Sequence, residues 1–217
     1  ILHFGAVDYS AHIYIDERKA FDHRGGSSSF EVDITKFVTP GNTHSLVLHA
    51  EAFLRSATQG NGKQSKIYHS QLCAYSRTTG IWQTVWIEAV PIEGLKNCKL
   101  TTDIDNGTIS LVPTYYSQPI NKKLEIIIKG EGVEVAKQTV ICASGATTTI
   151  KLSNPRLWST IDPYLYDIEL RMLDDSFEQY DYVETYIGLR KFDIRGNRFY
   201  LNNKPIYLRW VLDQGFY

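Results

Sequence analysis

The side chains best suited to acid–base chemistry or metal binding in this chain are its histidines. Six occur, at His3, His12, His23, His44, His49 and His69. None stands four residues from another, the spacing by which a helix presents two imidazoles to one metal ion. The chain also contains no Gly-x-Ser-x-Gly elbow and no phosphate-binding glycine loop. We therefore interpret the histidines as separate core or surface residues, and predict no metal site and no cofactor.

An acidic stretch around Asp103 and Asp105 carries oxygen ligands but lacks the spacing of a calcium loop. No bidentate glutamate follows at the required distance. Asn106-Gly107 is instead typical of a hairpin turn, and we predict one there.

The cysteines do not form a recognisable framework. There are three, far apart in the chain, at Cys73, Cys98 and Cys142. Their odd number and spacing predict reduced core thiols rather than disulfides or metal ligands, which favours a cytoplasmic location.

Composition excludes several classes of partner. A formal net charge of -1, with 22% charged residues, gives no electrostatic basis for binding nucleic acid or an anionic membrane. No apolar run reaches the length of a membrane-spanning segment. The 217 residues suffice for one large or two ordinary domains. The first residue is not Met, and residues 1–9 read as an interrupted strand, so we expect a piece of a longer protein.

Residues 76–88 carry the strongest structural signal. A polar turn ending at Gly80 leads into an extended run in which Trp82 and Trp86 share one face and aliphatic residues the other. Because both faces are apolar, the pattern predicts a central strand that is buried on two sides. The two indoles are then core residues rather than platforms for a sugar.

This stretch, RTTGIWQTVWIEAVP, closely resembles the end of the sugar-binding jelly-roll domain of glycoside hydrolase family 2, the β-galactosidase and β-glucuronidase family. Residues 23–35, 154–166 and 186–191 resemble further family motifs in the same order. The chain departs from the family at Asp16-Glu17, where Asn-Gly is usual, so we expect a looser hairpin. It also has Trp210 where many members have Gly, and the resemblance does not identify the sugar.

The resemblance implies an all-β fold with three parts. Residues 1–91 would be a partial jelly-roll β-sandwich without its first strands, and residues 92–187 an immunoglobulin-like β-sandwich with Trp158 closing one end. Residues 188–217 would be a linker and the first strand of a TIM-type barrel, with residues 205–212 as a buried parallel strand.

The resemblance also implies retaining hydrolysis by two glutamates. One protonates the leaving oxygen and the other attacks the anomeric carbon, with their carboxyl groups about 5–5.5 Å apart. In the family both lie on the barrel, and the acid/base glutamate follows an asparagine. This chain has no Asn-Glu dipeptide, and its last glutamate is Glu184. We therefore predict no catalytic residue in this chain and no activity of the chain alone.

Sugars are bound by aromatic faces together with amide or charged groups that reach their hydroxyls. In the family the jelly roll lends a loop to the active-site rim. The substrate-binding candidates are Lys63, Gln64, Tyr75, Arg77, Gln83, Asp213 and Gln214. The partners implied are a β-glycoside carbohydrate and the catalytic barrel, with homo-oligomerisation left open.

The leading prediction is thus the non-catalytic, sugar-binding and spacer portion of a family 2 glycosidase. The alternative is a stand-alone carbohydrate-binding or assembly β-sandwich module. A carbohydrate-binding module would need an exposed aromatic row on a sheet face. An assembly module would be recognised from its size in solution.

Overall fold

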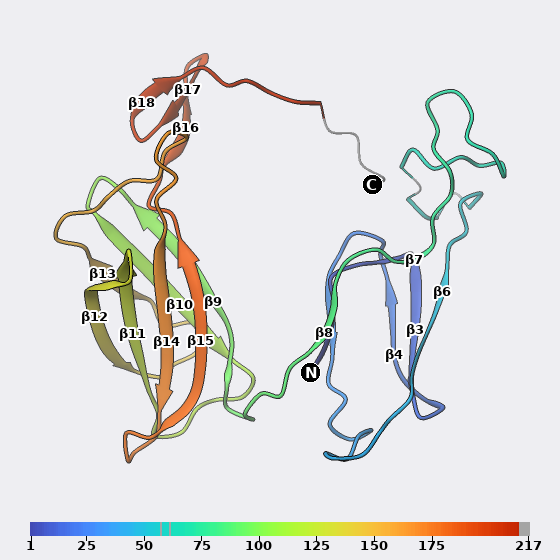
Figure 1. Ribbon diagram of the computed structural model, residues 1–217, viewed down its shortest axis with the longest axis horizontal. Helices are drawn as coiled ribbons and strands as arrows, with labels where there is room; N and C mark the ends of the chain where they lie inside the picture. Colours follow the sequence, from blue (N-terminus) through green and yellow to red (C-terminus); the bar gives the residue numbers. More distant parts are fainter. Residues whose placement is uncertain (57, 61, 213–217) are drawn as a thin grey trace. The chain divides into compact units, whose positions relative to one another are not determined.

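The computed structural model of this chain describes residues 1–56, 58–60 and 62–212 (Figure 1). Within them, the regular structure consists of β-strands β1 to β18, without a helix. The predicted all-β class is confirmed. Two compact units, Ile1–Ala89 and Val90–Trp210, divide the chain. None of the described residues belongs to a helical segment that could span a bilayer.

The first unit contains three antiparallel sheets. One has the order β4 (Arg18–Arg24), β3 (Ser10–Ile15), β6 (Leu46–Glu51). Another has the order β5 (Phe30–Val32), β1 (Leu2–Phe4), β8 (Val85–Ile87). A two-stranded sheet pairs β2 (Val7–Asp8) with β7 (Gly80–Ile81).

Strand β3 shows how the sequence separates the core from the outer surface. Ala11, Ile13 and Ile15 are buried, whereas the alternating His12 and Tyr14 are only half-buried. A period of two places these sets on opposite faces. The inward set joins one core with Leu2, Phe4, Val7, Val32 and Ile34. The histidine therefore lies on the outer face of its sheet.

The β3–β4 hairpin is tighter than predicted. Ile15 pairs directly with Arg18, so the loop has only two residues, Asp16 and Glu17, with φ of 46° and 65°. Both values fit the type I′ turn that hairpins prefer. The Asp16 carboxylate accepts a hydrogen bond from the Ser45 amide at 2.8 Å. This hydrogen bond stabilises the turn, and aspartate tolerates positive φ, so the tight turn forms without the usual Asn-Gly.

The prediction of a central, doubly buried strand over residues 76–88 is wrong. The segment forms two short strands, β7 and β8, and each lies at the edge of its sheet. Trp82 is 49% exposed and Trp86 41% exposed, so neither is a core residue. Trp82 Nε1 instead donates to the Gly26 carbonyl at 2.6 Å, and Trp86 stacks on His3. Periodicity cannot distinguish packing on both faces from apolar faces that are left exposed.

The second unit is built on two antiparallel sheets. One has the order β13 (Thr148–Lys151), β10 (Thr108–Tyr115), β9 (Leu95–Asp103). The other has the order β12 (Val133–Ile141), β11 (Lys123–Gly130), β14 (Tyr166–Leu173), β15 (Gln179–Ile187). Buried residues of both sheets form one core, as in an immunoglobulin-like sandwich.

Strands β11 and β14 pair their inward residues in exact register. Leu124 lies opposite Met172, and Ile126 lies opposite Leu170. All four are essentially inaccessible to solvent, and each contributes roughly 1.5–3 kcal/mol by burial. The sequence of β14 alternates in the same way, which places Leu170 and Met172 on one face of the strand.

One loop of the second unit, the predicted hairpin turn at Asn106-Gly107, matches its prediction. Asn106-Gly107 lies in the β9–β10 hairpin loop, where the Asp103 carboxylate accepts hydrogen bonds from the amides of residues 105 and 106. Trp158 is half-buried beyond the end of β15, with its amide bonded to the Leu189 carbonyl at 3.0 Å. A Cβ placed at Gly188 would lie 3.0 Å from the indole, so a larger residue there would press on Trp158.

A three-stranded antiparallel meander follows, with the order β16 (Phe192–Arg195), β17 (Arg198–Leu201), β18 (Lys204–Ile206). The predicted barrel strand at 205–212 is not present. Residues 204–206 pair antiparallel with β17, and residues 207–212 form no strand and are largely exposed. A parallel strand needs parallel neighbours, and β17 provides only an antiparallel edge.

The three cysteines are free thiols, as predicted. Their placement as core residues holds for Cys142, which is buried, and partly for Cys98, which is half-buried. It is wrong for Cys73, which is exposed in the segment between β6 and β7. That segment is rich in polar residues and contributes few side chains to a core.

Candidate functional site

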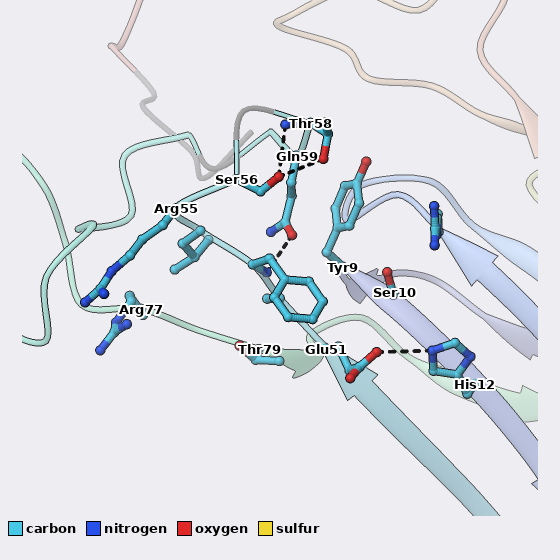
Figure 2. A pocket seen from close by; sticks show the side chains of 14 residues that line it. Tyr9, Ser10, His12, Glu51, Arg55, Ser56, Thr58, Gln59, Arg77 and Thr79 are labelled. Atoms are coloured by element: carbon cyan, nitrogen blue, oxygen red, sulfur yellow. Dashed lines mark hydrogen bonds and ion pairs between the residues drawn. The ribbon is translucent and has the colours of Figure 1, made fainter.

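The first unit contains a pocket of about 810 Å³, which we call the β3–β6 pocket (Figure 2). It lies where β3 begins, β4 and β6 end, and the chain after β6 turns back. Its lining residues are Tyr9, Ser10, His12, Arg24, Glu51, Ala52, Phe53, Leu54, Arg55, Ser56, Thr58, Gln59, Arg77 and Thr79. Two aromatic rings, hydroxyls, an amide and several charges thus meet in one concavity.

Pairing between β3 and β6 sets the floor of the pocket. Ser10 lies opposite Glu51, and the Tyr9 amide donates to the Glu51 carbonyl at 3.3 Å. The Gly25 amide donates to the Tyr9 carbonyl at 3.0 Å. Backbone bonds to two strands therefore fix the position from which the Tyr9 ring projects.

Gln59 fixes the loop that forms the opposite wall. Its Oε1 accepts a hydrogen bond from the Phe53 amide at 2.7 Å, and Ser56 Oγ lies 2.7 Å from Thr58 Oγ1 (Figure 2). The Gln59 side chain is largely buried, with 8% of the residue exposed. Among the described residues, its Nε2 has no hydrogen-bond partner. An unsatisfied buried donor of this kind costs about 1–3 kcal/mol.

The charges lining the pocket are mostly positive. Arg24, Arg55 and Arg77 contribute guanidinium groups, and Glu51 is the only acidic side chain among the described lining residues. Arg55 Nε donates to the Lys66 carbonyl at 3.0 Å, which holds the side chain along the loop. Three guanidinium groups beside one carboxylate favour an anionic or hydroxyl-rich ligand.

Of the predicted site residues, the structure brings one to this pocket. Arg77 lines it, with its guanidinium 5.8 Å from the Tyr68 ring. Lys63 and Tyr75 lie in the same segment, where the Tyr75 amide donates to the Lys63 carbonyl at 2.7 Å. Gln83 is exposed beside β8 and does not line the pocket.

Gln64 is only 4% exposed, and its amide bonds to other residues of the chain. Nε2 donates to Asp8 Oδ2 at 3.0 Å, and Oε1 accepts from the Thr78 amide at 2.8 Å. Asp213 and Gln214, the remaining two candidates, lie outside the described residues.

Sequence reasoning missed most of the pocket. Tyr9 and Ser10 lie at the start of β3 and Phe53 lies just after β6, and nothing in the linear pattern brings them together. The available signal was the position of a polar loop directly after β6, because loops held by a rigid sheet commonly carry binding residues. Sequence reasoning also missed His12, His49 and Glu51, which could together hold a metal ion.

Comparison with known proteins identifies the relatives of this chain. Residues 83–190 match the sequence model described as Glycosyl hydrolases family 2. A putative beta-glucuronidase of Formosa agariphila is 28% identical over 96% of this chain and 25% of its own length. A beta-galactosidase of Thermoanaerobacter pseudethanolicus is 26% identical over 96% of this chain and 28% of its own. This chain thus spans little more than a quarter of either relative.

Solved structures share the fold. A β-glucuronidase from Ruminococcus gnavus superposes with a TM-score of 0.75 and 22% identity, over 96% of this chain and 36% of that chain. A putative beta-galactosidase from Bacteroides fragilis gives a TM-score of 0.70 with 23% identity, over 94% of this chain and 32% of that one. At this identity, the likeness extends to the fold alone.

Proposed function

We propose that this chain is the non-catalytic, sugar-binding and spacer portion of a retaining β-glycosidase of glycosyl hydrolases family 2. The relatives named beta-glucuronidase and beta-galactosidase align with nearly all of it. Residues 1–91 would be the sugar-binding jelly roll, residues 92–187 an immunoglobulin-like spacer, and residues 188–217 the connection to a catalytic barrel. The two glutamates of retaining hydrolysis would lie on that barrel.

The observation that carries a sugar-binding role is the lining of the β3–β6 pocket, which combines two aromatic rings with hydroxyls and guanidinium groups. The Tyr9 and Phe53 rings offer apolar faces to a pyranose ring, and the polar groups can reach its hydroxyls. Pockets for small molecules combine such apolar surfaces with a few fixed polar groups.

The charge of the pocket supports a narrower substrate class. A guanidinium can bind a carboxylate with two parallel hydrogen bonds, which favours a sugar acid over a neutral sugar. Arg24, Arg55 and Arg77 are available for this, with only Glu51 opposing them among the described lining residues. We propose a β-linked uronic acid as the preferred ligand of the pocket.

Titration of the chain with methyl β-D-glucuronide and methyl β-D-galactoside, followed by two-dimensional amide NMR, tests this proposal. The sharpest variant is Gln59→Glu, which keeps an oxygen for the Phe53 amide but removes the donor and adds a negative charge. We expect it to weaken glucuronide binding at least tenfold. Gln71→Glu makes the same change at an exposed position outside the pocket and should have no effect.

If neither sugar perturbs the amides of residues 53–59 and 77–79, or if both variants behave alike, the pocket is not a sugar site. That outcome would leave the second candidate, an assembly module. The exposure of Trp82 and Trp86 at sheet edges favours it, because exposed apolar patches mark interaction surfaces. A concentration-dependent mass that falls in Trp86→Ser would then identify association through β8.

A further inference from the structure

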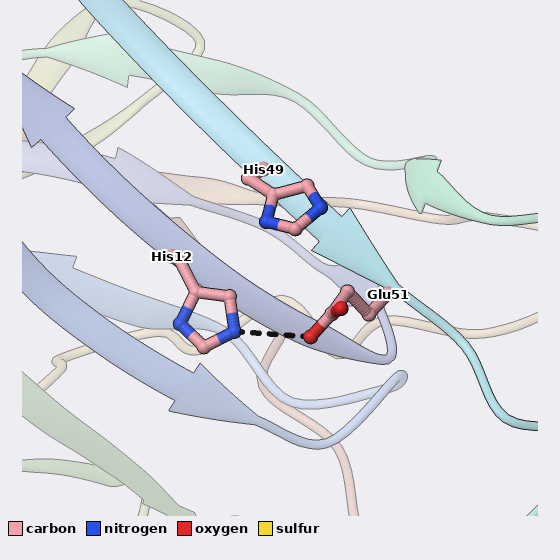
Figure 3. Close-up of side chains that lie close together, drawn as sticks. All are labelled: His12, His49 and Glu51. Atoms are coloured by element: carbon pink, nitrogen blue, oxygen red, sulfur yellow. Dashed lines mark ion pairs between the residues drawn. The ribbon is translucent and has the colours of Figure 1, made fainter.

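Three potential metal ligands converge on the outer face of the β4–β3–β6 sheet: His12, His49 and Glu51 (Figure 3). His12 on β3 lies directly opposite His49 on β6 in the antiparallel register. Glu51 follows His49 by two residues, and the period of a strand therefore returns it to the same face. Two adjacent strands alone thus bring the three groups together.

The separations are close to those of a metal site. His12 Nε2 lies 3.4 Å from Glu51 Oε2, and one ligand atom from each of the three residues lies within 4.8 Å of the others. In a tetrahedral zinc site with bonds of about 2.1 Å, ligand atoms stand roughly 3.4 Å apart. The His12–Glu51 pair already has that spacing. His49 is exposed, so its ring can rotate to close the remaining gap.

Asp22 on β4 orients the His12 ring. Its Oδ1 lies 2.6 Å from His12 Nδ1, and its Oδ2 lies 2.8 Å from Lys19 Nζ. The Asp22 carboxylate thus accepts hydrogen bonds from the Lys19 ammonium and from the His12 ring. Nδ1 must then carry the proton, and in the neutral ring Nε2 offers its lone pair toward Glu51. Carboxylates orient metal-binding histidines in the same way.

We propose that His12, His49 and Glu51 bind a divalent transition-metal ion of the zinc class, with Asp22 as a positioning residue. Two imidazole nitrogens and one carboxylate oxygen suit zinc, copper or nickel rather than magnesium. A fourth coordination position stays open to water. His12 and Glu51 also line the β3–β6 pocket, together with Arg24. Metal binding by these three residues does not require that the pocket bind a sugar.

The alternative is an ion pair in which a protonated His12 lies between Asp22 and Glu51 and His49 takes no part. The two arrangements differ in what they require of His49. A metal site needs its imidazole, whereas the ion pair does not. A test centred on His49 therefore separates them.

The test is calorimetric titration of the full 217-residue chain with ZnCl2, in a Cys73→Ser background that removes the exposed thiol. We expect one zinc ion per chain, no response to MgCl2, and at least tenfold weaker zinc binding in His49→Gln. Asp22→Asn should weaken binding about 10- to 100-fold through the orientation of His12. His69→Gln removes an exposed histidine outside the cluster and should leave binding unchanged.

Imidazole NMR spectra provide a second readout. Zinc should shift the ring signals of His12 and His49 together and leave those of His69 in place. His49 is exposed, so His49→Gln is expected to fold even if a His12 variant does not. If wild-type protein takes up no zinc, or if His49→Gln binds it as tightly, the proposal is wrong and the cluster is an ion pair.

Discussion

Gln64 Nε2 donates a hydrogen bond to Asp8 Oδ2 at 3.0 Å, across 56 residues of chain. The same amide accepts from the Thr78 backbone at 2.8 Å, so one side chain links the middle and the end of the loop between β6 and β7 to β2. Arg77 and Thr79, which flank Thr78, both line the β3–β6 pocket. By holding the Thr78 amide, Gln64 fixes the backbone from which Arg77 and Thr79 extend into the lining of the pocket.

Replacing Gln64 should destabilise the first unit. Gln64→Ala leaves the half-buried Asp8 carboxylate and the Thr78 amide without this partner, at a cost of about 1–3 kcal/mol. We expect the first unit to unfold at lower denaturant concentration, as measured by tryptophan fluorescence, because Trp82 and Trp86 lie in this unit. Gln71→Ala, at an exposed position of the same loop, is the matched control. Equal midpoints for the two variants would contradict this structural role.

Arg77 should distinguish acidic from neutral sugars. If its guanidinium holds a uronate carboxylate, glucuronide binding should fall in the order wild type, Arg77→Lys, Arg77→Ala, because lysine keeps the charge but not the paired hydrogen bonds. Galactoside binding should change little in either variant. Dissociation constants from NMR titration measure this order, and an equal loss for both sugars would argue against carboxylate recognition.

His44 and Asp16 provide a pH test of the β3–β4 turn. Their side chains lie 2.6 Å apart, and this hydrogen bond is the main cause of the raised pKa of His44 and the lowered pKa of Asp16. His44 Nε2 also lies 2.9 Å from the Thr39 amide and 3.2 Å from its carbonyl. The ring thus has a backbone partner in either protonation state, and the bond to the Thr39 backbone raises the pKa of His44 further, after the larger contribution of Asp16.

The sign of the effect follows from these directions. The histidine contribution to stability is complete below pH 6.5, its ordinary pKa, and is lost as pH rises through the raised value. The aspartate contribution is present above pH 3.8 and is lost as pH falls through the lowered value. In Asp16→Asn, the His44 titration followed by NMR should shift back toward 6.5. Glu17→Gln changes the same charge in the same turn, and an equal shift there would exclude the Asp16 contact as the cause.

The sequence pattern agrees with the structure where apolar and polar residues alternate and one face of the strand is buried. Residues 166–172 alternate and bury one face of β14, and Asn106-Gly107 turns where its conformational preference requires. The prediction was wrong at Trp82 and Trp86. A strand with apolar residues on both faces has the same sequence pattern whether or not another layer of the protein covers those faces. Strand pairing is a further barrier, since His12 and His49 are 37 positions apart in the sequence and meet only through the β3–β6 register.

The chain alone should hydrolyse no 4-nitrophenyl β-glucuronide or β-galactoside above background. Retaining hydrolysis needs an acid and a nucleophile about 5–5.5 Å apart, and the Asn-Glu dipeptide expected at the acid does not occur in the sequence. A colorimetric assay at high protein concentration measures this. Turnover that copurifies with the chain and disappears in Glu51→Gln or Glu169→Gln would show that the assignment as non-catalytic is wrong.

Two truncations should separate the roles of the C-terminal residues. A chain that stops after Ile206 loses Tyr207, Trp210, Val211 and Leu212, which are all exposed. It should keep its melting temperature and associate less with itself, because little burial is lost and an apolar surface is removed. A chain that stops after Arg190 also loses the β16–β18 meander. Asn202 Nδ2 of that meander donates to the Trp158 carbonyl at 2.9 Å.

The longer truncation should therefore lower the melting temperature of the second unit. The Asn202 bond is worth about 0.5–1.5 kcal/mol, and the Asp105 carboxylate loses its contacts to Lys191 at 2.5 Å and Asn203 at 2.7 Å. A decrease of several degrees is expected for a domain of this size, and calorimetry measures it. Equal melting temperatures for the two truncated chains would mean that contacts between the meander and the sandwich do not stabilise the second unit. Unfolding of the shorter chain would instead make residues 191–206 part of its core.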